Sequence, residues 1–281
     1  MEKRKPRRIK EVANVKELLK EAVENYGNED VFQIKLSPVT QKKDIQYRTV
    51  TYQTLWDEVM AYGTKLYDLG LKEKRVAILG RNQYGWVVAH LANLLGGMVS
   101  IPLDKDLQDE ELESSLVRSK AEVFVFDAKY MDKVQKIQQE KKTQVKTFIC
   151  MTPLEGYIDL PSLIEQGKEL VAKGKTEFLD YEPDGKNMSI LLFTSGTTSK
   201  SKAVMLSQYG IVTNIYDMLL VENFYEGDVN IAFLPFHHIF GSTCMLVMLA
   251  AGVKTVFPDG LRYIQTNLKE YGVSVFVGVP V

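Results

Sequence analysis

Short apolar runs alternate with amphipathic segments along most of the chain. Apolar residues recur at steps of three and four from Leu55 to Leu69, which predicts an amphipathic helix. Thr51 precedes this helix as an N-cap, and Gly70 follows it where a helix C-terminus favours glycine. The next apolar run, residues 76–79, is short and continuous, which is typical of a strand buried on both faces.

The same alternation continues to the end of the chain. The expected strands are 76–79, 99–103, 123–126, 146–150, 188–193, 203–206, 231–234 and 254–257, and the expected helices are 86–95, one around 112–116, 133–141, 208–222, 241–251 and 261–272. Strands separated by single helices at short spacing predict an α/β fold with mostly parallel sheets and helices on both faces.

One polar stretch, LDYEPDGKN at residues 179–187, has the composition of a linker. It predicts a first α/β subdomain at 1–187 and the start of a second at 188–281. The last residues, VSVFVGVPV, are apolar, whereas natural termini are usually polar and exposed. We therefore expect residues 1–281 to be the incomplete N-terminal part of a longer protein.

Composition excludes several classes of protein. The chain is 45% hydrophobic and 25% charged, which is ordinary for a globular protein, and its net charge of −1 argues against nucleic-acid binding. The two cysteines, Cys150 and Cys244, lie far apart in apolar surroundings, and there are three histidines. This usage argues against a disulfide framework or a zinc site and favours a reducing compartment, so we expect a cytoplasmic protein.

No segment has the length of a membrane-spanning helix. The longest apolar run, residues 244–253, ends at Lys254, and about 20 residues are needed to cross a bilayer. The N-terminal MEKRKPRRIK is strongly basic but is followed by no apolar region, so it is not a secretory signal. It could make a weak contact with anionic lipid or be a frayed, solvated tail, and we expect the tail.

The stretch LLFTSGTTSKSKAVMLS, residues 191–207, concentrates hydroxyl groups, a glycine and two lysines between two predicted strands. Backbone N–H groups and hydroxyls in such a loop suit phosphate oxygens, and a lysine adds a compact cation. The loop is not a Walker A motif, because Ser201 stands where that motif needs its second glycine. By composition alone, a solvent-exposed Ser/Thr/Lys loop is an equally good interpretation.

The order of these residues resembles the phosphate-binding signature of the adenylate-forming (AMP-binding) superfamily, which includes acyl-CoA synthetases and is written [YF]TSGTTGxPKGVMLSH. The matching residues are Phe193, Thr194, Ser195, Gly196, Thr197, Thr198, Lys202, Val204, Met205, Leu206 and Ser207. The departures are Ser199 for glycine, Ser201 for proline, Ala203 for glycine and Gln208 for histidine, and they change the conformational freedom of the loop.

The resemblance covers nearly the whole chain. Residues 49–104 look like the opening of a bacterial long-chain acyl-CoA synthetase, and LPFHHIFG, residues 234–241, looks like a second family motif, LPxxHxxG. His238 aligns with the motif histidine, which implies a place beside the carboxylate-activation site. The alternative is a core histidine on a strand-to-helix turn. His237 is expected to be a neighbour that packs or faces solvent.

The resemblance implies an acid–thiol ligase that activates a fatty acid with ATP to an acyl-adenylate and then to a coenzyme A thioester. It implies that His238 is catalytic, and that ATP, Mg²⁺ and coenzyme A take part. It assigns the ATP phosphates to Thr194, Ser195, Gly196, Thr197, Thr198 and Lys202. The family's adenine (YGxTE), ribose (TGD) and lid-lysine elements do not occur in residues 1–281, so we expect this chain alone to have little activity.

Two other interpretations stay open. The protein could be an acyl-AMP ligase or an enzyme that acylates a carrier protein instead of coenzyme A. It could also be a non-catalytic homologue that binds nucleotide or acyl chain, because Ser199, Ser201 and Ala203 depart from the signature. Acyl chain length depends on pocket depth, and the sequence does not give it or the oligomeric state.

Overall fold

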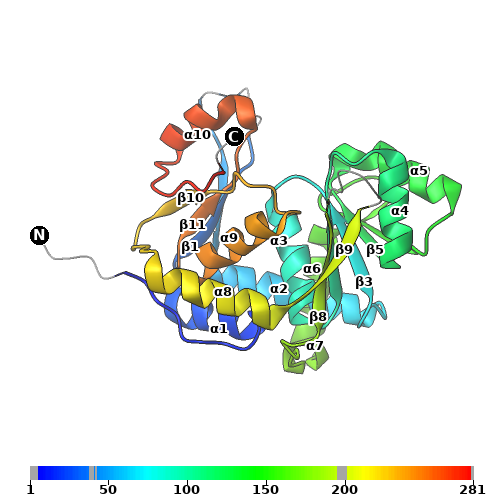
Figure 1. The fold of residues 1–281 in the computed structure, drawn as a ribbon, viewed down its shortest axis with the longest axis horizontal. Coiled ribbons are helices and arrows are strands. Elements are labelled where there is room, and N and C mark those ends of the chain that lie inside the picture. Colours follow the sequence, from blue (N-terminus) through cyan, green and yellow to red (C-terminus); the bar gives the residue numbers. More distant parts are fainter. Residues whose placement is uncertain (1–5, 38–40, 42, 195–200, 280–281) are drawn as a thin grey trace, which may run out of the picture. The chain divides into compact units, whose positions relative to one another are not determined.

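The structure is a computed structural model that describes residues 6–37, 41, 43–194 and 201–279. Its contacts divide the chain into two compact units. Unit 1 comprises residues 1–12, 17–56 and 211–281, and unit 2 comprises residues 13–16 and 57–210. Three described helices contain residues of both units: α1 (Val15–Tyr26), α2 (Tyr52–Asp68) and α8 (Gln208–Val221). Figure 1 labels all three.

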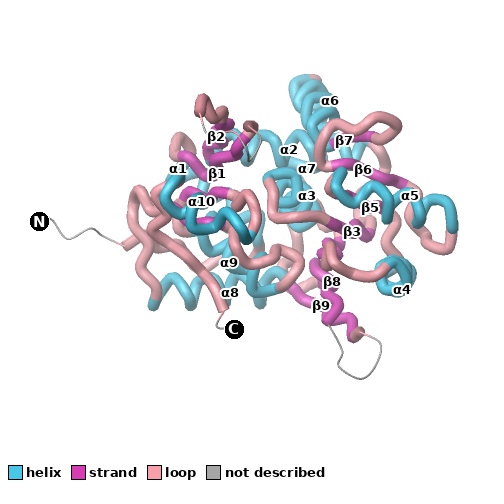
Figure 2. Tube along the Cα trace, turned by 90° about the horizontal axis from the view of Figure 1, so that it is seen from above, coloured by secondary structure: helices cyan, strands magenta, loops and turns pink. Residues whose placement is uncertain are grey.

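Unit 2 is built on a seven-stranded sheet in the order β7-β6-β5-β3-β4-β8-β9. All neighbouring strands are parallel except β8 and β9, which form an antiparallel pair at one edge. Figure 2 shows β8 and β9 side by side. Besides part of α2, its elements are β3 (Arg75–Leu79), α3 (Tyr84–Leu95), β4 (Val99–Leu103), α4 (Asp109–Ser119), β5 (Val123–Phe126), η1 (Ala128–Tyr130), α5 (Met131–Glu140), β6 (Thr147–Cys150), β7 (Ile158–Asp159), α6 (Leu160–Ala172), α7 (Glu177–Asp180), β8 (Met188–Thr194) and β9 (Lys202–Ser207).

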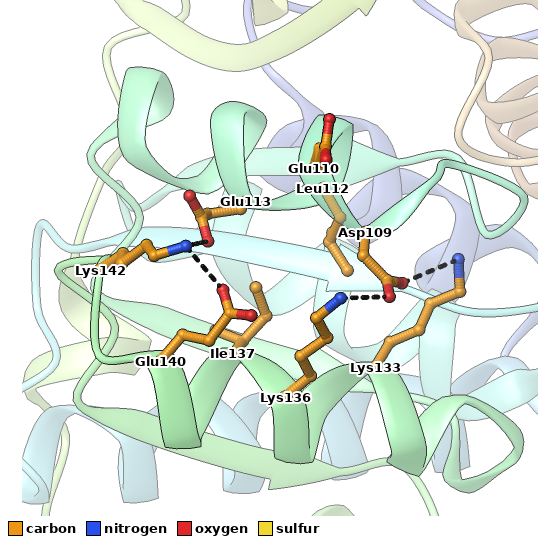
Figure 3. Close-up of a pocket in the computed structure, with 9 residues that line it drawn as sticks. All are labelled: Asp109, Glu110, Leu112, Glu113, Lys133, Lys136, Ile137, Glu140 and Lys142. Carbon is orange, nitrogen blue, oxygen red and sulfur yellow. Dashed lines mark hydrogen bonds and ion pairs between the residues drawn. The ribbon is translucent and has the colours of Figure 1, made fainter.

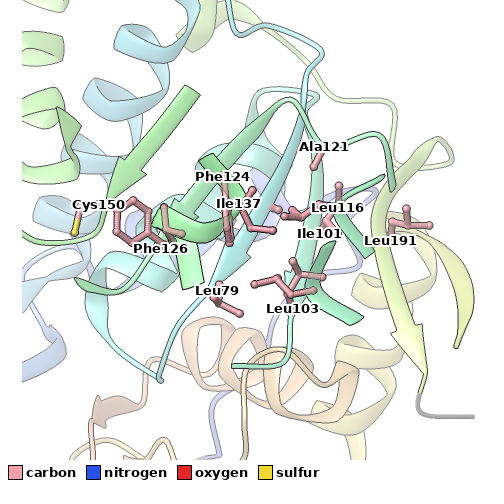
Figure 4. Close-up of a cluster of buried hydrophobic side chains, with 13 residues drawn as sticks. Leu79, Ile101, Leu103, Leu116, Ala121, Phe124, Phe126, Ile137, Cys150 and Leu191 are labelled. Carbon is pink, nitrogen blue, oxygen red and sulfur yellow. The ribbon is translucent and has the colours of Figure 1, made fainter. Parts of the chain in front are cut away.

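The core of unit 2 lies on one face of this sheet, under α4 and α5 (Figure 4). Leu79, Phe126 and Cys150 are register partners on neighbouring strands, so their side chains share that face. Leu116 of α4 and Ile137 of α5 pack on the same cluster. Since side chains alternate along a strand, a second helix layer is needed on the opposite face.

Helix α3 supplies that second layer. It is buried along its whole length, and His90 lies against β4 with its Nδ1 2.8 Å from the Ser100 Oγ. The Asn93 Nδ2 donates to the same hydroxyl at 3.3 Å. Burial lowers the pKa of His90 to about 3, so the imidazole is neutral at physiological pH. The predicted α/β class, with helices on both faces of a mostly parallel sheet, is confirmed.

Unit 1 contains a four-stranded sheet in the order β10-β11-β1-β2. Strands β10, β11 and β1 are parallel, and β2 pairs antiparallel with β1. Helix α10 packs on β10 and β11 through Ile264 and Leu268. Besides α1 and the start of α2, its elements are β1 (Asp30–Lys35), β2 (Tyr47–Thr51), most of α8 (Gln208–Val221), β10 (Val229–Ile231), α9 (Ile239–Ala250), β11 (Lys254–Val256), η2 (Leu261–Tyr263) and α10 (Ile264–Glu270).

The basic N-terminal segment is folded onto unit 1 at Arg7. The Arg7 guanidinium donates to the Gly252 carbonyl at 2.9 Å and to the Glu29 carboxylate at 2.7 Å, and it lies 4.4 Å from the centroid of the Tyr26 ring. The Arg7 backbone N–H donates to the Phe224 carbonyl at 2.9 Å. Gly252 follows the C-terminus of α9, Tyr26 is the last residue of α1, and Phe224 follows the C-terminus of α8. The dipole of a helix favours a cation at its C-terminus. The expectation of a frayed tail is therefore wrong for the described part of this segment.

The Thr51 Oγ1 accepts from the Thr54 N–H at 3.1 Å, and Gly70 has φ +73°, so both predicted ends of α2 are confirmed. The strand expected at 231–234 is wrong in position, because β10 occupies Val229–Ile231. Both cysteines are free and buried, as expected.

The contacts do not divide the chain at residue 187. Strands β8 and β9, which follow that point, belong to the same sheet as β3 and β4, which precede it. Strand β1, from the beginning of the chain, pairs with β11, from near its end. The compact units therefore combine segments that are distant in the sequence, and a polar linker alone does not locate their boundary.

Candidate functional site

The β8–β9 hairpin carries the predicted phosphate-binding stretch. The two strands pair antiparallel as far as Thr194 and Lys202, which are register partners at its open end. β8 is the inner strand, parallel to β4, and it is mostly buried, whereas β9 forms the edge of the sheet and is exposed. The described part of the predicted stretch therefore ends at Thr194 on the inner strand and resumes at Ser201, just before the edge strand.

The structure describes only part of the predicted set. Thr194 and Lys202 are both exposed. Within the described part of the chain, the Lys202 ammonium forms no ion pair, so its charge is not used by a neighbouring carboxylate. Ser195, Gly196, Thr197 and Thr198 lie outside the described residues.

An arginine that the sequence did not single out lies at the base of this hairpin. Arg118, in the last turn of α4, donates from Nη1 to the Ser201 Oγ at 3.0 Å and from Nη2 to the Ser201 carbonyl at 2.6 Å. Its Cζ lies 5.1 Å from the centroid of the Phe193 ring. Arg118 and Ser201 are 83 residues apart in the sequence, and no local pattern connects them.

The second predicted motif, residues 234–241, forms the turn into α9 in unit 1. His238 is the N-cap of that helix, and its Nδ1 accepts from the Phe240 N–H at 3.3 Å. A neutral imidazole that accepts at Nδ1 carries its proton on Nε2. The Nε2–H, which we call the outer N–H, is then the donor on the side of the ring opposite the helix cap. The His238 side chain is exposed, so the interpretation as a core histidine is wrong. His237 is half-buried.

A steric constraint explains why a glycine occupies the last position of this motif. Gly241 lies so close to the preceding turn that a Cβ there would be 2.1 Å from the Pro235 carbonyl oxygen and 3.0 Å from the Leu234 carbonyl oxygen. The Pro235 carbonyl also accepts from the His238 N–H at 3.1 Å. The glycine therefore lets α9 pack directly on the turn that holds the histidine.

A small hollow of about 10 Å³ lies beside this motif in unit 1. It could hold about one water molecule and is too small for an acyl chain. Its lining includes Phe236, Gly241 and Cys244. Burial raises the pKa of the Cys244 thiol to about 11, so this cysteine is not an activated nucleophile.

A larger pocket, about 140 Å³, lies between α4 and α5 (Figure 3). Most of its charged groups are paired with one another: Lys142 bridges Glu113 and Glu140, and Asp109 contacts Lys136 and Lys133. Because these side chains are partly exposed and mutually neutralised, this pocket is an ion-pair network on the surface rather than a site for chemistry.

The described residues show neither a metal-binding cluster nor a membrane-spanning helix. They contain no group of three or more His, Cys, Asp or Glu side chains that could hold a metal ion. Their helices include none with both the length and the apolar character required to cross a membrane.

Comparison with known proteins adds to this geometry. Residues 19–281 match the family described as AMP-binding enzyme. A long-chain-fatty-acid–CoA ligase 5 of Rattus norvegicus is 28% identical over 258 residues, which cover 85% of this chain and 38% of the relative. A fatty acyl-CoA synthetase B of Dictyostelium discoideum is 24% identical over 249 residues, covering 84% of this chain and 36% of the relative. The chain thus spans less than half the length of these relatives.

Solved structures share the fold. The adenylation domain of a carboxylate reductase from Mycobacterium chelonae superposes with a TM-score of 0.81 at 19% identity, over 95% of this chain and 46% of that one. A long-chain-fatty-acid-CoA ligase from Archaeoglobus fulgidus gives a TM-score of 0.78 at 15% identity, over 97% of this chain and 52% of that one. At these identities the likeness concerns the arrangement of the backbone.

Proposed function

The chain belongs to the AMP-binding enzyme family, and from that premise we propose that the protein activates a fatty acid with ATP. A carboxylate oxygen attacks the α-phosphorus, pyrophosphate leaves, and an acyl-adenylate forms. A thiol sulfur, that of coenzyme A, then attacks the acyl carbon and AMP leaves. The observation that carries this proposal is the β8–β9 hairpin, whose strand ends carry Thr194 and Lys202, a lysine that forms no ion pair with any residue that the structure describes.

Each predicted residue has a role in this scheme. Lys202 neutralises phosphate charge, and Thr194 donates its hydroxyl to a phosphate oxygen, together with Ser195, Gly196, Thr197 and Thr198. Mg²⁺ would be held by the phosphate oxygens of ATP, since this ion commonly binds through substrate phosphates. His238 directs its outer N–H toward the reacting carboxylate or the α-phosphate, as the motif LPFHHIFG implies.

The names of the relatives support a fatty acid as the substrate and coenzyme A as the acceptor. Transfer to a carrier protein is the second candidate. The family motifs found in residues 1–281 do not distinguish an enzyme that uses coenzyme A from one that uses a carrier protein. A non-catalytic homologue would keep the fold and lose the affinity for phosphates, so nucleotide binding separates it from both enzymes.

The test measures binding of nucleotides to the 281-residue chain by calorimetry. Mg·ATP should bind more tightly than Mg·AMP, and adenosine should bind least, because every contact proposed for residues 194–202 is with a phosphate. Lys202→Ala should weaken Mg·ATP binding by about tenfold or more, since one charge-assisted hydrogen bond contributes about 1.5–3 kcal/mol. Lys168→Ala is the matched control, because Lys168 is an exposed lysine of unit 2 paired only with Glu165 on its own helix.

The proposal fails if adenosine binds as tightly as Mg·ATP, or if Lys202→Ala and Lys168→Ala bind Mg·ATP equally. Pyrophosphate release with ATP and palmitate is the second measurement. This chain alone should release little, because the adenine, ribose and lid elements of the family are not in its sequence.

A further inference from the structure

One guanidinium contacts both strands of the β8–β9 hairpin. Arg118 donates two hydrogen bonds to Ser201, which immediately precedes β9, and its Cζ lies 5.1 Å from the centroid of the Phe193 ring in β8. The planar fork of an arginine suits this task, since it can donate in two directions and stack on an aromatic ring at the same time.

The helix that carries Arg118 is itself fixed. Leu112 and Leu116 of α4 are buried in the core of unit 2, and the Arg75 guanidinium donates to the Ser119 carbonyl at 2.8 Å at the end of the helix. The Arg118 side chain therefore starts from a rigid base, although it is itself exposed. A contact from such a base restricts the hairpin more than a contact between two mobile side chains would.

The partner of Arg118 is one of the positions that depart from the family signature. Where the signature has proline, this chain has Ser201. Proline fixes its own φ near −65° and needs no partner to do so, whereas serine leaves the backbone free. The hydrogen bond from Arg118 to the Ser201 carbonyl orients the peptide group that joins Ser201 to Lys202, and the bond to Oγ holds the side chain.

We propose that Arg118 is a positioning residue that replaces the missing proline and holds Lys202 in place for phosphate binding. The inference rests on the proposed function only for its last step. It acts through Ser201 and the first peptide group of β9, and it assigns no contact between Arg118 and the substrate.

The test compares Arg118→Met with Lys168→Met, which removes an equal charge from α6 of the same unit. Hydrogen exchange of peptides covering residues 201–207 is measured without nucleotide, and Mg·ATP affinity is measured by calorimetry. Arg118→Met should raise the exchange rate about tenfold and weaken Mg·ATP binding about tenfold, whereas Lys168→Met should change neither.

Ser201→Pro supplies the rescue. In the Ser201→Pro background, Arg118→Met should weaken Mg·ATP binding by no more than about twofold, because the proline then restricts the backbone; the coupling is read from a double-mutant cycle. Ser201→Ala removes only the Oγ acceptor and leaves α4 unchanged, so it replaces Arg118→Met if that variant does not fold. It should raise exchange in residues 201–207 by about threefold.

The outcomes separate the two proposals. Unchanged exchange in Arg118→Met and Ser201→Ala overturns the positioning role, whatever the affinity for nucleotide. Raised exchange with unchanged Mg·ATP affinity also overturns it, since the contact of Arg118 with Ser201 would then order β9 without contributing to nucleotide binding. If the unaltered chain binds no Mg·ATP, the proposed function fails, and raised exchange still establishes the contact that orders β9.

Discussion

Replacing Gly241 by alanine adds one methyl group where the first turn of α9 meets the loop before it. The new Cβ would lie 2.1 Å from the Pro235 carbonyl oxygen and 2.7 Å from its carbonyl carbon. Carbon and oxygen atoms in contact are more than 3 Å apart, so the helix and the loop must separate by roughly 1 Å. Both contacts are with backbone atoms, so no side chain can rotate to relieve the overlap.

The magnitude follows from two opposing effects. Inserting a methyl group into a packed region costs about 1–3 kcal/mol, and alanine gains up to about 1 kcal/mol over glycine inside a helix. We therefore expect Gly241→Ala to lower the free energy of unfolding by about 1–2 kcal/mol. Because the Pro235 carbonyl also accepts from the His238 N–H, the shift should reach the histidine as well.

Gly210→Ala is the matched control. Gly210 is the third residue of α8, as Gly241 is the third residue of α9, and a Cβ at Gly210 would meet only the Ser207 Oγ at 3.7 Å. Gly210→Ala should raise the free energy of unfolding by up to about 1 kcal/mol.

The assay is urea unfolding followed by circular dichroism, with the imidazole signals of His238 recorded by NMR. Equal stability of the two alanine variants, with the His238 signals unmoved in Gly241→Ala, would refute the steric explanation of the motif glycine.

Two further predictions concern buried titratable groups. The pKa of His90 is about 3 in the folded chain, and an unfolded histidine has a pKa near 6.5, so between these values the unfolded state binds more protons. Stability should therefore be complete above about pH 6.5 and should fall below it, by up to about 1.4 kcal/mol per pH unit. His90→Phe should reduce this loss in urea titrations at pH 4 and 7, and an identical loss in both proteins would contradict the assignment. The pKa of Cys244 is raised to about 11, so a disulfide reagent at pH 8 should label it about 100-fold more slowly in the folded chain than in urea. Comparable rates would mean that the thiol is open to solvent.

Local signals predicted much of the fold. The Thr51 cap, the apolar spacing of α2 and Gly70 lie within one helix and its ends, so a short window contains all the information. The buried strands of unit 2 could be predicted equally well, because a parallel sheet that is covered on both faces requires continuous apolar runs in its strands.

The pairing of the strands at the beginning of the chain could not be predicted from local signals. The β1–β2 hairpin is followed in the sequence by more than 150 residues before β11, its parallel neighbour, appears. Periodicity shows whether a segment is a strand but does not show which strand lies beside it, so the division at residue 187 could not be tested on the sequence alone.

The candidate site shows the same limit. The order of residues around Thr194 and Lys202 predicted a phosphate-binding loop between two strands, and β8 and β9 are those strands. Their antiparallel pairing was not predicted. Arg118 could not be found, because its contact with Ser201 is produced by the packing of α4 and not by any spacing in the sequence.

The Arg7 side chain is 10% exposed, and its hydrogen bonds reach chain segments that lie up to 245 positions away. Truncation of the chain beyond Arg7 would remove these hydrogen bonds. Such a truncation would also remove a positive charge from the place where the C-terminal ends of α1, α8 and α9 lie, and it would leave the Glu29 carboxylate without its ion pair. A tag or a cleavage site inserted between Arg7 and α1 would therefore disturb the packing of unit 1.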